Sequence, residues 1–257
     1  MSARFVQGSL ALHAAALPAL AIFPSQWGWI AGALVANHTA IVAAGLAPRS
    51  SLLGENLAHD AAAARAGAVA LTFDDGPDAE VTPKVLDLLD KVGARATFFC
   101  IGRRVAAHPA LAAEIVRRGH RVENHTHTHR GSFYFHAPRT LALEIGDCQK
   151  AIADATGRLP TLFRAPAGIR SPMLQPALAA SGLRLCSWTR RGFDTVRRNP
   201  VAIARSLTRG VVPGDVLVLH DGATHERPGR VRMLGRVLPQ VLFELRDLRL
   251  AIVPVTG

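Results

Sequence analysis

Two carboxylates stand side by side directly after an apolar run in this sequence. Asp74 and Asp75 follow Val69–Phe73 and precede Gly76 and Pro77. Adjacent carboxylates repel one another and are costly to hold together unless a cation or an arginine offsets them. The pair is therefore a candidate for acid–base or metal chemistry. The alternative is a turn or helix cap, which an Asp-Gly-Pro sequence often supplies.

Three histidines alternate with threonines between His125 and His129. Neutral imidazoles at positions i and i+4, joined by a carboxylate from elsewhere, form a ligand set for zinc or a similar divalent ion and leave a coordination position open for water. The spacing does not decide which two of the three bind, since all three share a face on an extended strand. Surface histidines in a loop are the alternative. A metal in this setting would favour hydrolytic chemistry.

Two further residues whose side chains could take part in acid–base chemistry stand at the ends of apolar runs. His220 follows residues 217–219 and can donate a proton to a leaving group. It could instead be a core histidine paired with Asp215 or Asp221. Arg164 can orient an acidic base through its planar guanidinium, or it can form an ordinary ion pair.

The elements that must position these residues alternate between short β-rich runs and amphipathic stretches, which predicts parallel strands with crossover helices. We expect strands near Val69–Phe73, Ala96–Ile101, His120–His125, Thr161–Ala165, Leu183–Trp188, Val216–His220 and Leu250–Val255. We expect helices near Pro83–Val92, Pro109–Arg118, Arg139–Ala155, Ser171–Ala180, Pro200–Arg209 and Val231–Arg246. Seven strands predict an α/β fold with a distorted (β/α)7 barrel, and an open doubly wound sheet is the alternative. Either architecture gathers the carboxyl ends of the strands at one site.

The N-terminal part of the chain is apolar. No charged residue lies between Arg4 and Arg49, and the stretch breaks near Pro24 into two runs of about 20 residues, the length that crosses a bilayer as a helix. Trp27 and Trp29 at the break suit the membrane interface, and one arginine flanks each outer end. We expect a transmembrane hairpin with both ends on the cytoplasmic side of the inner membrane. A cleaved signal peptide is the alternative.

Domain boundaries follow from this division. We expect a transmembrane helical hairpin at residues 1–48, a linker or short surface helix at 49–66 and the body at 67–257. His13, Asn37 and His38 are polar residues within the apolar runs, where they either have a function or pack one helix on the other. The three cysteines are widely spaced in apolar stretches, which favours buried reduced thiols over disulfides.

Four ordered motifs resemble those of the polysaccharide deacetylases, the NodB-homology group of carbohydrate esterases (family 4). They are residues 72–77 (TFDDGP), 125–129 (HTHTH), 164–168 (RAPAG) and 217–220 (LVLH), and the resemblance spans about Val69 to Val255. It implies a distorted β/α barrel and one divalent metal ion, commonly zinc, held by Asp75, His125 and His129. Catalytic roles would fall to Asp74 as general base, Arg164 as its ionic partner and His220 as the acid that protonates the departing amine.

The chain departs from the family pattern at two places. Ala167 stands where an aromatic residue is usual, so the backbone amide that helps to hold the oxyanion is kept and a wall of the pocket is lost. Arginines stand after Trp188 where an Asp is usual, and Asp194 is the candidate partner of His220. The candidate substrate-binding residues are Pro166, Ala167, Gly168, Trp188, Leu219 and Tyr134. Tyr134 belongs to an aromatic cluster that either forms a lid or packs in the core.

The resemblance implies a metal-dependent hydrolase that removes an N-acyl group, acetyl or formyl, from an amino sugar. A membrane hairpin and a formal net charge of +11 favour an anionic lipid-linked sugar as substrate, with membrane lipids around the anchor. The family resemblance implies that the lipid carrier is a polyprenyl phosphate. A periplasmic deacetylase of peptidoglycan or exopolysaccharide and a catalytically silent glycan-binding module are the alternatives. The scattered basic residues and the single tyrosine argue against a nucleic-acid partner. The sequence does not indicate an oligomeric state.

Overall fold

A curled parallel sheet forms the centre of the body in the computed structural model, which describes residues 2–222 and 230–256. The strands are β1 (Ala68–Asp74), β2 (Thr97–Cys100), β3 (Arg121–Asn124), β4 (Leu162–Phe163), β5 (Arg184–Leu185), β6 (Arg190–Arg191), β7 (Val216–His220) and β8 (Ala251–Val253). The helices are α1 (Ser2–Ile22), α2 (Trp27–Leu46), α3 (Ala61–Arg65), α4 (Thr82–Lys91), α5 (Gly102–Ala107), α6 (Pro109–Arg117), α7 (Pro138–Thr156), α8 (Leu174–Ala180), α9 (Pro200–Thr208) and α10 (Arg230–Asp247). Three short 3-10 helices are η1 (Pro24–Gln26), η2 (Phe133–Phe135) and η3 (Pro166–Gly168).

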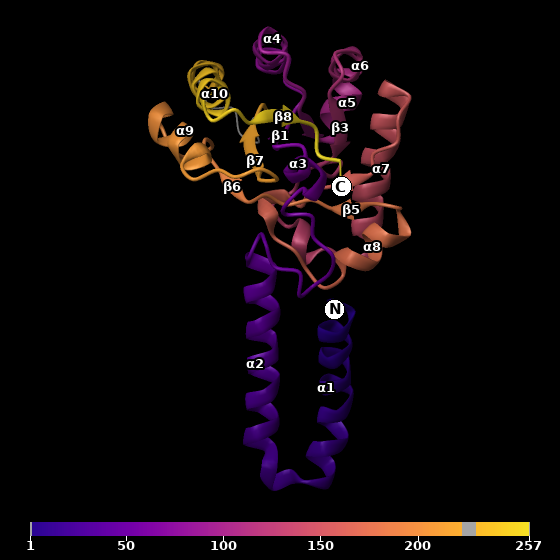
Figure 1. The fold of residues 1–257 in the computed structure, drawn as a ribbon. Helices are drawn as coiled ribbons and strands as arrows, with labels where there is room; N and C mark the ends of the chain where they lie inside the picture. Colours follow the sequence, from indigo (N-terminus) through magenta and orange to yellow (C-terminus); the bar gives the residue numbers. More distant parts are fainter. Residues whose placement is uncertain (1, 223–229, 257) are drawn as a thin grey trace.

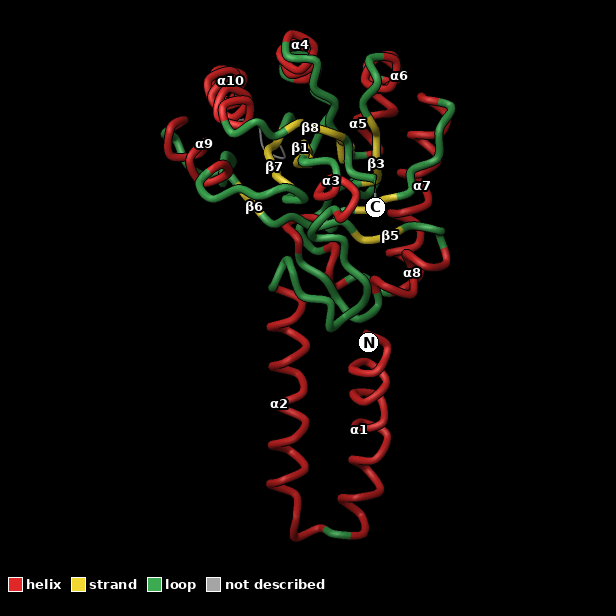
Figure 2. The backbone as a smooth tube through the Cα atoms, in the orientation of Figure 1, coloured by secondary structure: helices red, strands yellow, loops and turns green. Residues whose placement is uncertain are grey.

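The order of the strands is that of a barrel. They lie in the order β5-β4-β3-β2-β1-β7-β6, with β8 beside the start of β1, and the paired strands are parallel. The chain passes directly from β5 into β6 at the opposite edge, whereas a doubly wound sheet would reverse its direction at a switch point. In Figures 1 and 2 the strands gather in the middle of the body and the longer helices lie at its periphery. The predicted α/β barrel is confirmed.

Side chains along β1 point alternately into the core under the helices and into the interior of the barrel. Leu71 and Phe73 pack in the core beneath the helices, where the Phe73 and Phe98 rings stack with centroids 5.0 Å apart. Thr72 and Asp74 face the interior, where both accept hydrogen bonds from Arg164. Because side chains alternate, the last residue of β1 presents its carboxylate at the carboxyl end of the barrel.

The structure adds elements that the sequence pattern did not reveal. Helix α5 and strand β6 were not expected, and the predicted strand Leu183–Trp188 is reduced to the two residues of β5. Helix α3 lies in the segment 49–66, where a linker or a short surface helix was expected. Leu57 donates its backbone N–H to the carbonyl of Leu185 at 2.8 Å, and Asp60 caps α3 by accepting from Ala62 and Ala63. The segment expected to be a linker or a short surface helix therefore packs against the body. The three cysteines are free and buried, as expected.

The apolar N-terminal stretch forms two long helices joined by η1, and they lie side by side below the body (Figure 1). Residues Arg4–Ile22 and Pro24–Leu46 are long and apolar enough to cross a membrane, and within the described chain at most 11% of either window is buried. Such helices are not core helices of the body. They are candidates for the expected hairpin.

Candidate active site

A pocket of about 150 Å³ opens at the carboxyl end of the barrel. It is lined by Asp74, Asp75, His125, His129, Ala167, Trp188, Arg191, Thr195, Val218 and His220. These residues come from β1, β6 and β7 and from the loops after β1, β3, β4, β5 and β6. Segments that are far apart in the sequence therefore contribute to one site, as a parallel barrel predicts.

Asp75, His125 and His129 form a candidate metal-binding group. One ligand atom from each lies within 4.8 Å of the others. Asp75 Oδ1 is 3.4 Å from His125 Nε2 and 3.3 Å from His129 Nε2. Ligands bound about 2.0–2.1 Å from a tetrahedral zinc ion lie roughly 3.3 Å apart, so these separations fit a shared divalent ion.

Local backbone conformation brings these ligands together. Asp75, Thr126 and His129 have positive φ angles of 74°, 64° and 53°. A non-glycine residue in this region costs on the order of 1 kcal/mol, and such strain clusters at functional sites. The turn at Thr126 ends the alternation of β3, so His127 lies away from the group, near Gly102. The shared face that we expected for all three histidines does not form.

Hydrogen bonds orient the ligand side chains. His125 Nδ1 lies 2.8 Å from the carbonyl oxygen of Arg164, which leaves Nε2 facing Asp75. Thr126 Oγ1 accepts the backbone N–H of His129 at 3.0 Å. Thr126 in turn donates its own N–H to Asn124 Oδ1 at 3.0 Å. These bonds hold the loop in the conformation that presents both imidazoles.

The electrostatics of the group suit a cation. Burial acts to raise the pKa of Asp75, but the His125 hydrogen bond and the nearby imidazoles, including His220, lower it well below its usual range. Burial, followed by the charge of His125, lowers the pKa of His129 to about 4. At neutral pH the group therefore offers an ionised carboxylate and a neutral imidazole, the protonation states in which these side chains bind metals.

Asp74 is held by a buried arginine. Arg164 Nη1 donates to Asp74 Oδ1 at 2.7 Å and to Thr72 Oγ1 at 2.7 Å. Nε and Nη2 of the same side chain donate to the carbonyls of Cys186 and Ser187 at 3.1 and 3.0 Å. The guanidinium also lies over the Phe99 ring, 4.0 Å from its centroid. One oxygen of Asp74 is thus fixed in the barrel while the residue still lines the pocket.

His220 pairs with Asp194. The imidazole Nδ1 is 2.8 Å from Asp194 Oδ1, and the backbone N–H of His220 donates to Asp194 Oδ2 at 2.9 Å. Burial lowers the pKa of His220, but the charge and hydrogen bond of Asp194, together with Asp75 and Asp74, outweigh it and raise the pKa above its ordinary value. Neither Asp221 nor Asp215 is the partner: Asp221 accepts from Thr82 Oγ1 at 2.6 Å, and Asp215 accepts from Arg190 at 2.6 Å.

The loop of η3 forms one side of the pocket. Ala167 has a φ of 54° and lines the pocket. Gly168 has a φ of 74°, and a Cβ at this position would lie 2.5 Å from the Trp188 ring. Glycine is therefore needed for the loop to close against Trp188, which also lines the pocket.

The remaining expected residues have different positions. Leu219 lies in the core that packs beneath the helices, and its neighbour Val218 lines the pocket, because side chains alternate along β7. Tyr134 lies in η2 beside the buried Phe133 and does not line the pocket among the described residues. Neither residue is among the described residues that line the pocket, and their contact with substrate stays a prediction. Pro166 is buried in η3, next to the lining residue Ala167.

Two lining residues were not identified from the sequence. Arg191 and Thr195 flank the segment that carries Asp194, and both line the pocket. Arg191 could have been identified, because the arginines after Trp188 depart from the family motif. The contribution of Thr195 depends on the turn at Phe193, whose φ of 57° no sequence pattern indicated.

The metal-binding group makes a prediction that elemental analysis can test. We expect the purified protein to contain about one divalent ion per chain, and His125→Ala and His129→Ala to lose most of it, since each removes a ligand. His127→Ala is the matched control because His127 lies outside the group. Equal metal content in the wild type and both ligand variants would contradict the assignment. Loss of metal from His127→Ala instead would show that a different imidazole binds.

Comparison with known proteins reveals related sequences and structures. The family model for polysaccharide deacetylase matches residues 61–186. The chain is 34% identical over 175 residues to a peptidoglycan-N-acetylglucosamine deacetylase from Bacillus cereus, covering 67% of this chain and 81% of that protein. It is 38% identical over 155 residues to a chitooligosaccharide deacetylase from a Bradyrhizobium species, covering 60% and 70%. The solved family 4 carbohydrate esterase from Streptomyces lividans, in complex with acetate, is similar with a TM-score of 0.65 and 32% identity, covering 72% of this chain and 91% of that one.

Proposed function

The chain belongs to the polysaccharide deacetylase family, and from this membership we propose that it removes an acetyl or formyl group from the nitrogen of an amino sugar. The observation that carries the proposal is the single pocket that holds an arginine-paired carboxylate, an Asp-His-His group and an aspartate-paired histidine. These three arrangements provide a proton acceptor, a cation site and a proton donor. Metal-assisted hydrolysis of an amide uses all three functions.

Each residue has a distinct proposed role. Asp74 accepts a proton from the attacking water, and Arg164 holds this carboxylate in place by donating a hydrogen bond to it. His220 donates a proton from Nε2 to the departing amine, while Asp194 holds Nδ1. The backbone amide of Ala167 donates a hydrogen bond to the oxygen of the acyl group as negative charge develops there.

The proposed cofactor is one divalent ion, with zinc as the first candidate. Asp75, His125 and His129 would hold it, since one oxygen and two nitrogens match the ligands of catalytic zinc sites. When bound, such an ion would polarise the acyl carbonyl and lower the pKa of a water molecule. The residues of the chain supply the proton transfers.

We place the enzyme at the membrane through helices α1 and α2. Polar side chains in these helices find partners within the hairpin: Asn37 Nδ2 donates to Ser9 Oγ at 2.8 Å, and the His13 and His38 rings meet with centroids 5.0 Å apart. This arrangement corresponds to the helix-packing alternative for these residues. Intramembrane polar groups need such internal partners because no water reaches them.

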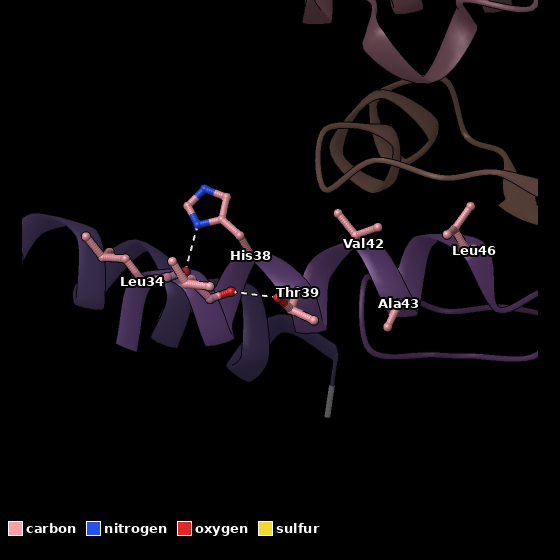
Figure 3. Close-up of a pocket in the computed structure, with 7 residues that line it drawn as sticks. Leu34, His38, Thr39, Val42, Ala43 and Leu46 are labelled. Atoms are coloured by element: carbon pink, nitrogen blue, oxygen red, sulfur yellow. Dashed lines mark hydrogen bonds between the residues drawn. The ribbon is translucent and has the colours of Figure 1, made fainter. Parts of the chain in front are cut away.

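One face of α2 is also suited to lipid. An apolar groove of about 570 Å³ runs along it and is lined by Leu34, Val35, His38, Thr39, Val42, Ala43 and Leu46 (Figure 3). Its two polar side chains bond to the helix backbone, His38 Nδ1 to the carbonyl of Leu34 and Thr39 Oγ1 to that of Val35, both at 2.9 Å. These bonds give partners to Thr39 Oγ1 and to one of the two ring nitrogens of His38, and the remaining lining side chains are apolar, so the surface is suited to acyl chains.

The pocket loop is tied to the end of α2. Arg170 follows η3 and is buried, and its guanidinium donates to the carbonyls of Ala44, Ala47 and Ser50 at 2.8–2.9 Å. The loop that carries Ala167 is thus joined to the membrane anchor through a three-residue link. We infer that the pocket works close to the bilayer surface, which favours a lipid-linked amino sugar.

We propose that the body faces the cytoplasm. Arg4 and Arg49 flank the hairpin on the side of the body, and the tip between the helices carries no charge. The second candidate is an envelope enzyme acting on peptidoglycan, favoured by the 34% identity to the peptidoglycan-N-acetylglucosamine deacetylase. That activity requires the opposite orientation.

Membrane attachment and orientation can be measured together. We expect the full chain to stay in the membrane fraction after high-salt and carbonate washes, because two spanning helices are not released by screening charge. A green fluorescent reporter fused after Gly257 should be active, and alkaline phosphatase fused there should not. Release by salt alone would show peripheral attachment. Phosphatase activity would reverse the orientation and favour the peptidoglycan candidate.

The substrate class can be tested in cells and in vitro. Mass spectrometry of lipid-linked sugars and wall glycans from cells lacking the protein should show an additional N-acyl group in one pool. The purified chain should then release a free amine from the same material. An acyl group retained on wall glycan alone would select the second candidate. An unchanged acyl content in both pools, with no amine released in vitro, would contradict deacetylase activity.

A further inference from the structure

Arg191 occupies the pocket without belonging to the proposed catalytic machinery. It is the last residue of β6 and pairs in register with Val218, and its side chain lines the same pocket as the Asp-His-His group. Its guanidinium carbon lies 5.3 Å from the centroid of the Trp188 ring and 5.2 Å from that of Phe193. A guanidinium that lies over a ring uses its face, so its N–H edges stay available for hydrogen bonds.

The charge of Arg191 has no counter-ion in the described part of the chain. Among residues 2–222 and 230–256, no carboxylate lies within ion-pair distance of it, and its Nε is buried without a hydrogen-bond partner. The preceding residue provides a contrast, because Arg190 pairs with Asp215 at 2.6 Å and donates to the carbonyl of Arg209 at 2.6 Å. A half-buried cation with a buried donor that has no partner costs free energy, unless a ligand supplies a counter-charge and accepts the hydrogen bond.

The three carboxylates that the proposed function uses already have other partners. Asp74 accepts from Arg164, Asp194 binds His220 through both oxygens, and Asp75 belongs to the metal-binding group. None of them offsets Arg191 by direct contact. As far as residues 2–222 and 230–256 are concerned, the positive charge of Arg191 is therefore not offset and faces the space that the substrate enters.

Resting on the proposed function, we propose that Arg191 binds an anionic group carried by the N-acylated amino sugar, a phosphate or a carboxylate. The planar guanidinium donates two parallel hydrogen bonds to either oxyanion, which is the geometry that arginine provides and lysine does not. Arg191 is thus a specificity residue: it selects charged amino sugars over neutral ones. A phosphate would come from the link to a lipid carrier, and a carboxylate from an acidic sugar.

Three soluble sugars test this recognition: N-acetylglucosamine, N-acetylglucosamine 1-phosphate and N-acetylmuramic acid, which carries a carboxylate. The quantity measured is kcat/KM for release of acetate by the full-length protein. We expect the wild type to prefer one of the anionic sugars over the neutral one by about 10- to 100-fold, the usual contribution of a charge-assisted hydrogen bond. The preferred anion identifies the source of the charge.

Variants at position 191 separate recognition from packing. Arg191→Gln should remove most of the preference, and Arg191→Lys should keep part of it, since lysine retains the charge without the paired donors. Arg198→Gln is the matched control, because Arg198 is exposed and does not line the pocket; it should leave the preference unchanged. If Arg191→Gln fails to fold, the wild-type preference and its partial loss in Arg191→Lys still decide the question.

The outcomes distinguish this inference from the proposed function. Equal kcat/KM for neutral and anionic sugars in the wild type would overturn the role of Arg191 and leave deacetylation standing. An equal loss on all three sugars in Arg191→Gln would also overturn it, because Arg191 would then only support Trp188 and Phe193. Failure of the wild type to release acetate from any of the three sugars or from a chitooligosaccharide, and to release formate from the N-formyl forms of the same sugars, would contradict the proposed function itself.

Discussion

Asp74→Asn is expected to abolish deacetylation while leaving the metal bound. The change removes the proton acceptor, yet the amide oxygen of asparagine can still accept the hydrogen bond that Arg164 donates to Oδ1 at 2.7 Å. A lost general base costs about 10²- to 10⁴-fold in rate, and we expect the upper end because no other described carboxylate of the pocket is free to replace it. The measurements are amine release and metal content on the same sample.

The matched control is Asp78→Asn in the segment that follows the same strand. Asp78 Oδ1 accepts the backbone N–H groups of Glu80 and Val81, a capping role that asparagine also fulfils, and Asp78 does not line the pocket. This variant should keep its activity. Activity retained within tenfold by Asp74→Asn would contradict the proposed base, and loss of metal in that variant would show that Asp74 is a ligand.

A change at Arg164 would be less informative. The side chain is fully buried and donates to two carboxylate or hydroxyl oxygens and two backbone carbonyls. Removing one partner of a buried pair leaves uncompensated polar groups and costs about 3–5 kcal/mol of stability. Loss of activity in such a variant would not separate catalysis from folding, whereas the nearly isosteric change at Asp74 does.

Much of the site could be predicted from the sequence because the barrel fixes where the ends of its strands lie. Parallel strands place their carboxyl ends on one face, so residues that end apolar runs were expected to meet. Asp74, His125, Arg164 and His220 do line or support one pocket in the structure. The helices were also located well, since proline marks the start of α6 and a left-handed Gly157 ends α7.

The details that sequence patterns missed depend on backbone turns. A two-residue period predicts a shared face for His125, His127 and His129, but the positive φ of Thr126 ends that period after one residue. Strand β6 was missed because it has only two residues, Arg190 and Arg191, and begins just after the end of the predicted strand Leu183–Trp188. Leu219 is different, because alternation from His220 already indicates that its side chain faces the helices.

His220→Ala is expected to lower kcat by about 10²- to 10⁴-fold with metal retained, because the leaving amine loses its proton donor. His220 lines the pocket and lies outside the metal-binding group. The two variants Asp74→Asn and His220→Ala should therefore resemble each other in metal content and in overall loss of rate. Their pH profiles should differ.

The pH profile of kcat/KM identifies the acid. The wild type should show a bell-shaped curve whose acidic limb reports the base and whose basic limb reports the acid, as macroscopic values of coupled groups. His220 acts only when protonated, so activity falls as pH rises through its pKa. Because Asp194 contributes to raising that pKa, the basic limb should lie above the ordinary histidine value of about 6.5. His220→Ala should lack this limb.

Asp194→Asn tests the altered motif directly. Asparagine can still accept a hydrogen bond from the backbone N–H of His220, but it carries no charge to stabilise the imidazolium. The pKa of His220 should fall, so the basic limb should move to lower pH and the rate near neutrality should drop. An unchanged limb and rate would show that Asp194 does not control His220, and full activity in His220→Ala would place the acid on another residue. A shifted limb together with a retained fold would establish that one aspartate keeps the histidine protonated even though arginines stand beside it in the motif.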